Sequence, residues 1–142
     1  MISDLFSLKG KVIVITGAAG LLGKKHAEAI AAFGGIPILL DLSQAVVEDI
    51  ANSLIQKFSI ESKGFKVDIT NELEVEKNAK LIFKQFGRID GLVNNAANNS
   101  EDGKGKGDNS SRLEEFPIAV WNKDIAVGLT GAFICSKYYG YF

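Results

Sequence analysis

The chain alternates between short apolar runs and longer segments in which apolar residues recur every three or four positions. Continuous runs of β-branched residues are typical of strands buried on both faces of a parallel sheet, and the longer spacing is typical of amphipathic helices. The runs predict strands over about 12–16, 36–40, 64–67 and 89–93. The periodic segments predict helices over about 21–33, 44–58, 70–86 and 117–139.

Helix-length segments between successive strands require crossover connections, which are right-handed in nearly all proteins. We therefore expect one α/β domain over residues 1–142, with a Rossmann-like, doubly wound parallel sheet of about four strands in the order 3-2-1-4 and flanking helices. Residues 98–111 interrupt this rhythm with alternating Gly, Lys and Asp, and they predict a mobile surface loop.

The helical spacing also predicts which side of each helix packs on the sheet. We expect Cys135 and Trp121 to lie in the core, and His26 to be a packed residue rather than an acid or base. The first helix should pack through Leu22, His26, Ala29, Ile30 and Phe33. The last helix should pack through Ile118, Trp121, Ile125, Leu129, Ala132, Phe133 and Ser136.

The composition and charge of the chain exclude several classes of function. The net charge is -1 and lysines are interspersed with glutamates, so neither nucleic acid nor a membrane is an expected partner. The single Cys135 rules out an internal disulfide, and the first residues lack a secretory signal. We expect a soluble, cytoplasmic protein, and we predict no metal site.

The sequence Thr16-Gly17-Ala18-Ala19-Gly20-Leu21-Leu22-Gly23 joins the first predicted strand to the first predicted helix. Glycines let backbone N–H groups approach an anion, and the positive end of the helix adds up to about 2 kcal/mol in a partly buried geometry. The pattern predicts a phosphate-binding turn. The alternative is a glycine turn with no ligand.

Asp41 ends the second predicted strand, 24 positions after Gly17. A carboxylate about 20 residues beyond such a turn typically binds the 2′-hydroxyl of an adenosine ribose. A 2′-phosphate about 4 Å from it would meet a repulsion of up to about 4 kcal/mol. Neither Leu42 nor Ser43 offers a compensating cation, so NAD is predicted rather than NADP. The alternative is a carboxylate that only ends the strand in a turn.

Two further strand ends bear polar side chains. Asp68 could accept the adenine amino group or could cap the turn before Asn71. Asn94-Asn95-Ala96-Ala97 follows the fourth predicted strand, where small residues let a cofactor lie against the backbone and the amides bind ribose or neighbouring strands. The alternative for this stretch is an Asn-rich turn.

With these residues assembled, the chain resembles the short-chain dehydrogenase/reductase family from near residue 5 to the end. The resemblance rests on the glycine turn, Asp41, Val67-Asp68, the stretch 89–97, and Trp121 followed by Leu129-Thr130-Gly131-Ala132-Phe133. It implies hydride transfer between a nicotinamide cofactor and a hydroxyl or carbonyl carbon. The implied cofactor-binding residues are Gly17, Ala19, Gly20, Leu21, Leu22, Gly23, Asp41, Leu42, Asp68, Ile69, Asn94, Asn95 and Ala96.

The chain departs from the family pattern in three ways. Its evenly spaced glycines are closer to the family's extended branch, although Asn94-Asn95-Ala96-Ala97 resembles the shorter branch. Gly128 stands where the last helix usually has an Asn that holds a relay water, and we interpret it as leaving space near the nicotinamide. The catalytic Ser and Tyr-x-x-x-Lys are expected beyond the last helix, and Tyr138, Tyr139 and Tyr141 do not replace them because none has Lys four places on.

The resemblance thus implies the amino-terminal cofactor-binding portion of an NAD-dependent oxidoreductase, inactive on its own, whose longer form acts on a small molecule as a homo-oligomer. The fragment should expose the edge of its fourth strand and an apolar face of its last helix. Residues 124–133 are similar to members linked to flagellin or surface-glycan modification. The alternatives are a nucleotide-sugar epimerase or dehydratase of the extended branch and a non-catalytic dinucleotide sensor.

Overall fold

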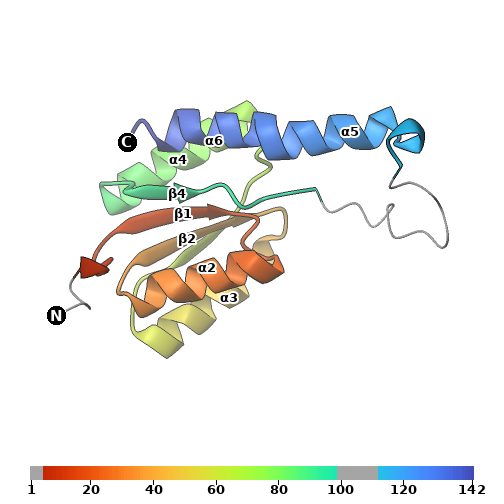
Figure 1. Cartoon of the computed structure of the whole chain (residues 1–142). Helices are drawn as coiled ribbons and strands as arrows, with labels where there is room; N and C mark the ends of the chain where they lie inside the picture. Colours follow the sequence, from red (N-terminus) through yellow and green to blue (C-terminus); the bar gives the residue numbers. More distant parts are fainter. Residues whose placement is uncertain (1–4, 99–111) are drawn as a thin grey trace.

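The computed structural model describes residues 5–98 and 112–142, and the predicted loop at 98–111 falls almost entirely outside these ranges. Four strands form one parallel sheet in the order β3-β2-β1-β4, which confirms the predicted topology (Figure 1). The strands are β1 (Val12–Thr16), β2 (Ile36–Asp41), β3 (Lys63–Lys66) and β4 (Gly91–Val93). The fourth strand is shorter than expected, because its pairing with β1 begins only at Gly91.

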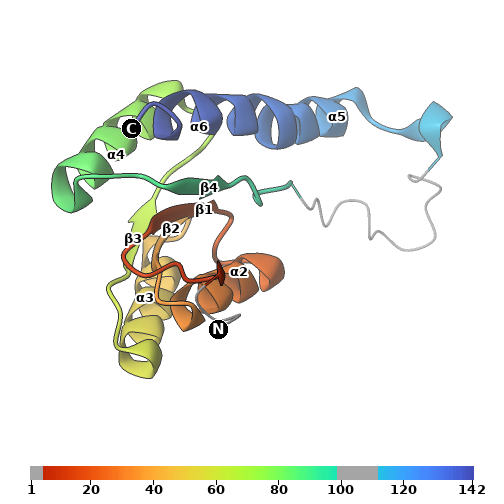
Figure 2. The same ribbon diagram turned by 60° about the vertical axis from the view of Figure 1, so that its left-hand side comes forward.

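Helices cover both faces of the sheet. Figures 1 and 2 show α2 and α3 on one face, and α4 with the last helix on the other. Their bounds are α2 (Leu21–Ala32), α3 (Gln44–Phe58), α4 (Glu72–Phe86), α5 (Ile118–Ile125) and α6 (Ala132–Tyr139), with a short 3-10 turn η2 (Leu113–Glu115) before α5. A π-helical segment, η3 (Ala126–Gly131), joins α5 to α6, so the predicted last helix is continuous but changes its winding midway.

Each face of the sheet contributes to its own apolar core. Val12, Val14, Ile38 and Leu40 pack towards α4 and α6, while Ile15 and Leu39 pack towards α2 and α3. This burial on both faces explains why β1 is an unbroken apolar run rather than an alternating one. The register pairs Thr16 with Leu40, so β1 and β2 end at the same level of the sheet.

The predicted packing face of α2 is wrong except at Ile30, which is buried as expected. Leu22, Ala29 and Phe33 are exposed and His26 is half-buried, whereas the buried residues of the helix are Gly23, Ala27, Ile30 and Ala31. The small side chains on this face let the helix lie close to the sheet. The pattern of large apolar residues therefore pointed to a face rotated by about one residue.

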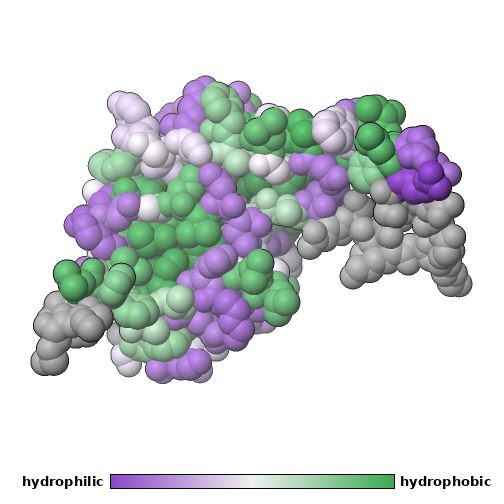
Figure 3. Space-filling view, in the orientation of Figure 1, coloured by the Kyte–Doolittle hydropathy of each residue, from purple (hydrophilic) through white to green (hydrophobic). Residues whose placement is uncertain are grey.

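The predicted packing face of the last helix is also wrong at several positions. Trp121 is 52% exposed and therefore not core, and Ile118, Leu129 and Phe133 are also exposed. The buried residues are Gly131, Ile134, Cys135 and Tyr139, and burial raises the pKa of the Cys135 thiol to about 12. The core position expected for Cys135 is confirmed. So is the exposed apolar face, which Figure 3 shows along the top of the molecule.

By length and composition alone, the described residues contain one helical stretch that could cross a membrane, Ile118–Tyr139. Core helices of soluble proteins pass the same test. Here the carboxyl-terminal half of the stretch packs on α4 and on the sheet through Ile134, Cys135 and Tyr139.

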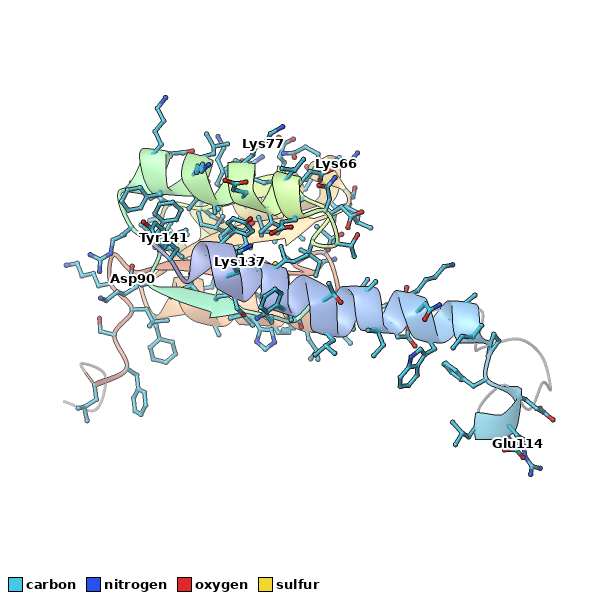
Figure 4. All side chains as sticks on the ribbon, turned by 90° about the horizontal axis from the view of Figure 1, so that it is seen from above. Lys66, Lys77, Asp90, Glu114, Lys137 and Tyr141 are labelled. Carbon is cyan, nitrogen blue, oxygen red and sulfur yellow. The ribbon has the colours of Figure 1, made fainter. Side chains whose placement is uncertain are left out.

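Asp90 joins the start of β4 to the start of β1. Its carboxylate accepts hydrogen bonds from the Val12 N–H at 2.9 Å and the Lys11 ammonium at 3.1 Å, and it pairs with the Arg88 guanidinium. Figure 4 shows Asp90 at the end of the sheet away from α5. The Arg88 hydrogen bonds, and then the Val12 and Lys11 contacts, lower the pKa of Asp90 to about 2.

We expect this carboxylate to make stability depend on acidity. Because its pKa is lower in the folded chain, its contribution is complete above pH 5 and is lost as the pH falls towards 2. The free-energy advantage of wild type over Asp90→Asn should shrink by about 1 kcal/mol between pH 6 and pH 3. Urea unfolding of both proteins across this range checks the result, and a constant difference contradicts it.

Candidate functional site

A cleft of about 770 Å³ opens at the carboxyl ends of the strands. In an open α/β sheet this edge, where the strand order reverses between β1 and β4, is the usual place for a ligand. The cleft is lined by Gly17, Ala19, Gly20, Leu21, Leu22, Leu40, Asp41, Leu42, Val67, Asp68, Ile69, Asn95, Ala96, Ala97, Asn98 and Val127.

The glycine turn forms one wall of the cleft and leaves no room for side chains at two of its positions. Gly17 has a φ of +65°, and a Cβ there would lie 2.8 Å from the Ala96 Cα. A Cβ on Gly23 would lie 2.3 Å from the Gly17 carbonyl oxygen and 2.7 Å from the Ala18 Cα. Gly23 does not line the cleft itself, so its role in the structure is to let α2 approach the turn.

The amino terminus of α2 opens on this wall. Gly20 precedes the helix without a side-chain cap, and the first turn contains no acidic residue. The first N–H groups of a helix have no partner within it. The turn therefore offers backbone donors and the positive end of the helix dipole to an anion.

Asp41 connects the second strand to the turn. One carboxylate oxygen accepts the Ala19 N–H at 2.9 Å and the other accepts the Leu42 N–H at 2.8 Å. The strand-ending turn role is thus present in the structure. Each oxygen of an ionised carboxylate has a second acceptor position, so Asp41 remains able to accept hydrogen bonds from a ligand in the cleft.

Asn95 and Thr16 fasten the end of β4 to the end of β1. The Asn95 amide donates to the carbonyl oxygens of Thr16 at 2.9 Å and Gly17 at 3.1 Å. The Thr16 hydroxyl oxygen accepts the N–H groups of Asn95 at 3.1 Å and Ala96 at 3.0 Å. Of the two roles considered for these amides, Asn95 takes the contact with a neighbouring strand, and the residue lines the cleft.

The side chains of Asn94 and Asp68 also form hydrogen bonds with other residues of the chain. The Asn94 amide donates to the Ser136 hydroxyl at 3.1 Å, and Asn94 does not line the cleft. Asp68 accepts the Thr70 N–H at 2.9 Å and the Thr70 hydroxyl at 2.7 Å, so it caps the turn before α4 while also lining the cleft.

Sequence reasoning missed four lining residues, whereas Ala97 belongs to the stretch 94–97 that was predicted to lie against a cofactor. Asn98 follows that stretch, and Leu40 and Val67 precede the two acidic strand ends, so extending each motif by one residue could have found them. Val127 comes from the π-helical segment, and no local signal marks it. Gly128 does not line the cleft, and a Cβ built on it meets nothing within 4 Å.

The described cleft residues include two acids, Asp41 and Asp68, and no Lys or Arg. No group of three or more His, Cys, Asp or Glu able to hold a metal is found in the described ranges. An anionic ligand would therefore rely on backbone N–H groups and the helix dipole rather than on a side-chain cation.

The tyrosines near the carboxyl terminus lie away from the cleft. Burial raises the pKa of Tyr139, whose hydroxyl donates to the Asn78 side-chain oxygen at 2.9 Å. A hydrogen bond to Glu72 at 2.8 Å raises the pKa of Tyr138. Figure 4 shows Lys137 and Tyr141 on the side of the last helix near α4. Both shifts raise the pKa and so move the Tyr138 and Tyr139 hydroxyls further from titration near neutral pH.

Residues 11–139 match the family model described as short chain dehydrogenase. The NADP-dependent mannitol dehydrogenase of Alternaria alternata is 29% identical over 98% of this chain and 50% of its own length. Among solved structures, the NADPH-dependent 3-quinuclidinone reductase from Rhodotorula rubra is 31% identical with a TM-score of 0.81, over 97% of this chain and 49% of the other. An NAD+-bound xylitol dehydrogenase is 26% identical with a TM-score of 0.80, over 94% and 48%. The chain spans about half the length of the curated relatives it matches.

Proposed function

The chain belongs to the short-chain dehydrogenase family, and we propose that it is the NAD-binding portion of an oxidoreductase that moves a hydride between nicotinamide and a hydroxyl or carbonyl carbon. The observation that supports this most directly is the cleft. It gathers a glycine turn, an uncapped helix amino terminus and a strand-ending carboxylate at the edge of the sheet where dinucleotides bind.

The residues fit a dinucleotide in a definite direction. The turn from Gly17 to Gly23 suits the pyrophosphate, since its backbone is open to the cleft and side chains are excluded at its ends. Asp41 suits the hydroxyls of the adenosine ribose. Asp68 and Ile69 suit the adenine, and the backbone at Asn95 and Ala96 suits the ribose towards the nicotinamide. When bound, the nicotinamide supplies or accepts the hydride.

We propose NAD rather than NADP as the cofactor. Family members use either one, and the relatives named above include both kinds. The choice of NAD rests on the absence of Lys and Arg among the described cleft residues and on the Asp41 carboxylate, which would repel a 2′-phosphate.

For the substrate, we propose a small polyhydroxylated alcohol or its ketone. Two of the relatives named above are a mannitol and a xylitol dehydrogenase. The link to flagellin or glycan modification stays a prediction from the resemblance. The named relatives are dehydrogenases and reductases, which favours hydride transfer over the nucleotide-sugar epimerase and dehydratase alternative.

Family members often form oligomers. We propose that this protein is a soluble, cytoplasmic homo-oligomer in which the exposed apolar face of the last helix, formed by Ile118, Trp121, Leu129 and Phe133, packs against a second copy. Apolar patches of this kind typically mark interfaces between proteins.

Calorimetry of the 142-residue chain with NADH tests the proposal. We expect a dissociation constant at or below about 1 mM, equivalent to roughly 4 kcal/mol of binding free energy, with no turnover of mannitol or xylitol. Absence of binding at several millimolar NADH contradicts the proposal. Tight binding without turnover in any longer form favours the non-catalytic sensor instead.

A further inference from the structure

Gly131 is buried at the end of the π-helical segment and faces the loop between β3 and α4. A Cβ built on it would lie 2.8 Å from the Ile69 Cδ1 and 2.9 Å from the Ile69 Cγ1, closer than real Cβ atoms approach other heavy atoms. The Ile69 side chain therefore occupies the space that any side chain at position 131 would need.

Ile69 is the residue through which this contact reaches the cleft. It lines the cleft beside Asp68, is only 8% exposed, and packs in the same apolar cluster as Val127. Val127, four residues before Gly131 in the same π-helical segment, lines the cleft as well. The last helix thus shapes this part of the cleft at two positions. The Val127 side chain lines the cleft, and Gly131 leaves space for Ile69 because it has no side chain.

We propose that Gly131 is a positioning residue for the adenine side of the cleft. Its missing side chain lets Ile69 lie back against the last helix, which keeps the cleft beside Asp68 open for a flat purine ring. This inference rests on the proposed dinucleotide site, in which Asp68 and Ile69 lie at the adenine. A methyl group at position 131 would move Ile69 from its rotamer and into the cleft that Ile69 lines.

The chain offers a matched control. Gly128 lies in the same π-helical segment, but a Cβ there meets nothing within 4 Å and the residue does not line the cleft. Both Gly→Ala changes alter helix propensity in the same way. A difference between them therefore reports the contacts of the added Cβ with Ile69 and, at 3.3 Å, with the Ala126 carbonyl oxygen rather than the stiffness of the helix, and a second change at Ile69 separates these two contacts.

The test compares binding of ADP-ribose, which contains adenine, with binding of nicotinamide mononucleotide, which does not. Gly131→Ala should weaken ADP-ribose binding by about tenfold and leave nicotinamide mononucleotide binding unchanged, while Gly128→Ala leaves ADP-ribose binding unchanged. Adding Ile69→Ala, which removes both the Cδ1 and the Cγ1 atoms, should restore ADP-ribose affinity to within about twofold of Ile69→Ala alone. Equal binding by Gly131→Ala and wild type, or no rescue in the double variant, overturns the inference.

A measurement on the wild-type chain covers the case in which Gly131→Ala does not fold. With methyl-labelled isoleucine, the Ile69 δ1 methyl should show a nuclear Overhauser effect to the Gly131 α-protons, and its shift should move with ADP-ribose but not with nicotinamide mononucleotide. An Ile69 methyl that ignores ADP-ribose while the ligand binds overturns the inference alone. Failure of wild type to bind ADP-ribose at all overturns the proposed function, and the inference with it.

Discussion

Replacing Gly23 by Ala is expected to destabilise the chain by at least about 2 kcal/mol and to abolish dinucleotide binding. The added Cβ would lie 2.3 Å from the Gly17 carbonyl oxygen and 2.7 Å from the Ala18 Cα. Both are backbone atoms, so no side-chain rotation relieves the overlap. Either α2 moves away from the sheet or the turn changes its path, and both movements displace the N–H groups that would hold the pyrophosphate.

Urea unfolding and NADH calorimetry of Gly23→Ala measure the two effects. Gly128→Ala is the control, because it makes the same chemical change in a helix where a Cβ meets no atom within 4 Å. The control should be as stable as wild type or up to about 1 kcal/mol more stable. Wild-type stability and affinity in Gly23→Ala would mean that the turn tolerates a side chain there.

Removing the charge of Asp41 is expected to change which cofactor binds. Wild type should bind NAD at least about tenfold more tightly than NADP, since a 2′-phosphate about 4 Å from the carboxylate meets a repulsion of up to about 4 kcal/mol. Asp41→Asn abolishes this repulsion and weakens the bonds to the ribose hydroxyls. NAD affinity should therefore fall, NADP affinity should rise, and the ratio should approach one.

The measurement is a pair of titrations, with NADH and with NADPH, for each protein. Asp49→Asn is the matched control: it removes the same charge from an exposed position on α3, outside the cleft. An unchanged cofactor ratio in Asp41→Asn, or tighter NADPH binding by wild type, contradicts the assignment of NAD.

The topology could be predicted because local signals agree with it. The unbroken apolar run of β1 and the helix-length connections lead to a parallel sheet, and the observed order is the predicted one. The packing faces of the helices were less predictable, because the spacing of apolar residues was judged mainly from the large ones. The buried face of α2 uses small residues such as Gly23 and Ala27 instead, and the last helix is buried at Gly131 as well as at the large Ile134 and Tyr139.

Many of the residues that line the cleft could be predicted from the sequence for the same reason. The turn, Asp41 and Asp68 are local features at strand ends, and a parallel sheet brings strand ends together. Val127 reaches the cleft from a helix 110 positions after Gly17, and no motif announces it. The hydrogen bond from Asn94 to Ser136 could not be predicted either, because it depends on where the last helix lies.

The hydrogen bonds between Thr16 and Asn95 join residues 79 positions apart in the chain. Such a contact closes a long loop, and contacts of this kind slow folding because the entropy of closure is lost before the contact forms. The glycine turn can form early beside its own strand, whereas the wall contributed by Asn95 and Ala96 waits for β4 to dock. The complete cleft thus forms late in folding. A dinucleotide that needs both walls would bind only chains in which both walls have formed, and by mass action it would raise the fraction of fully folded chains.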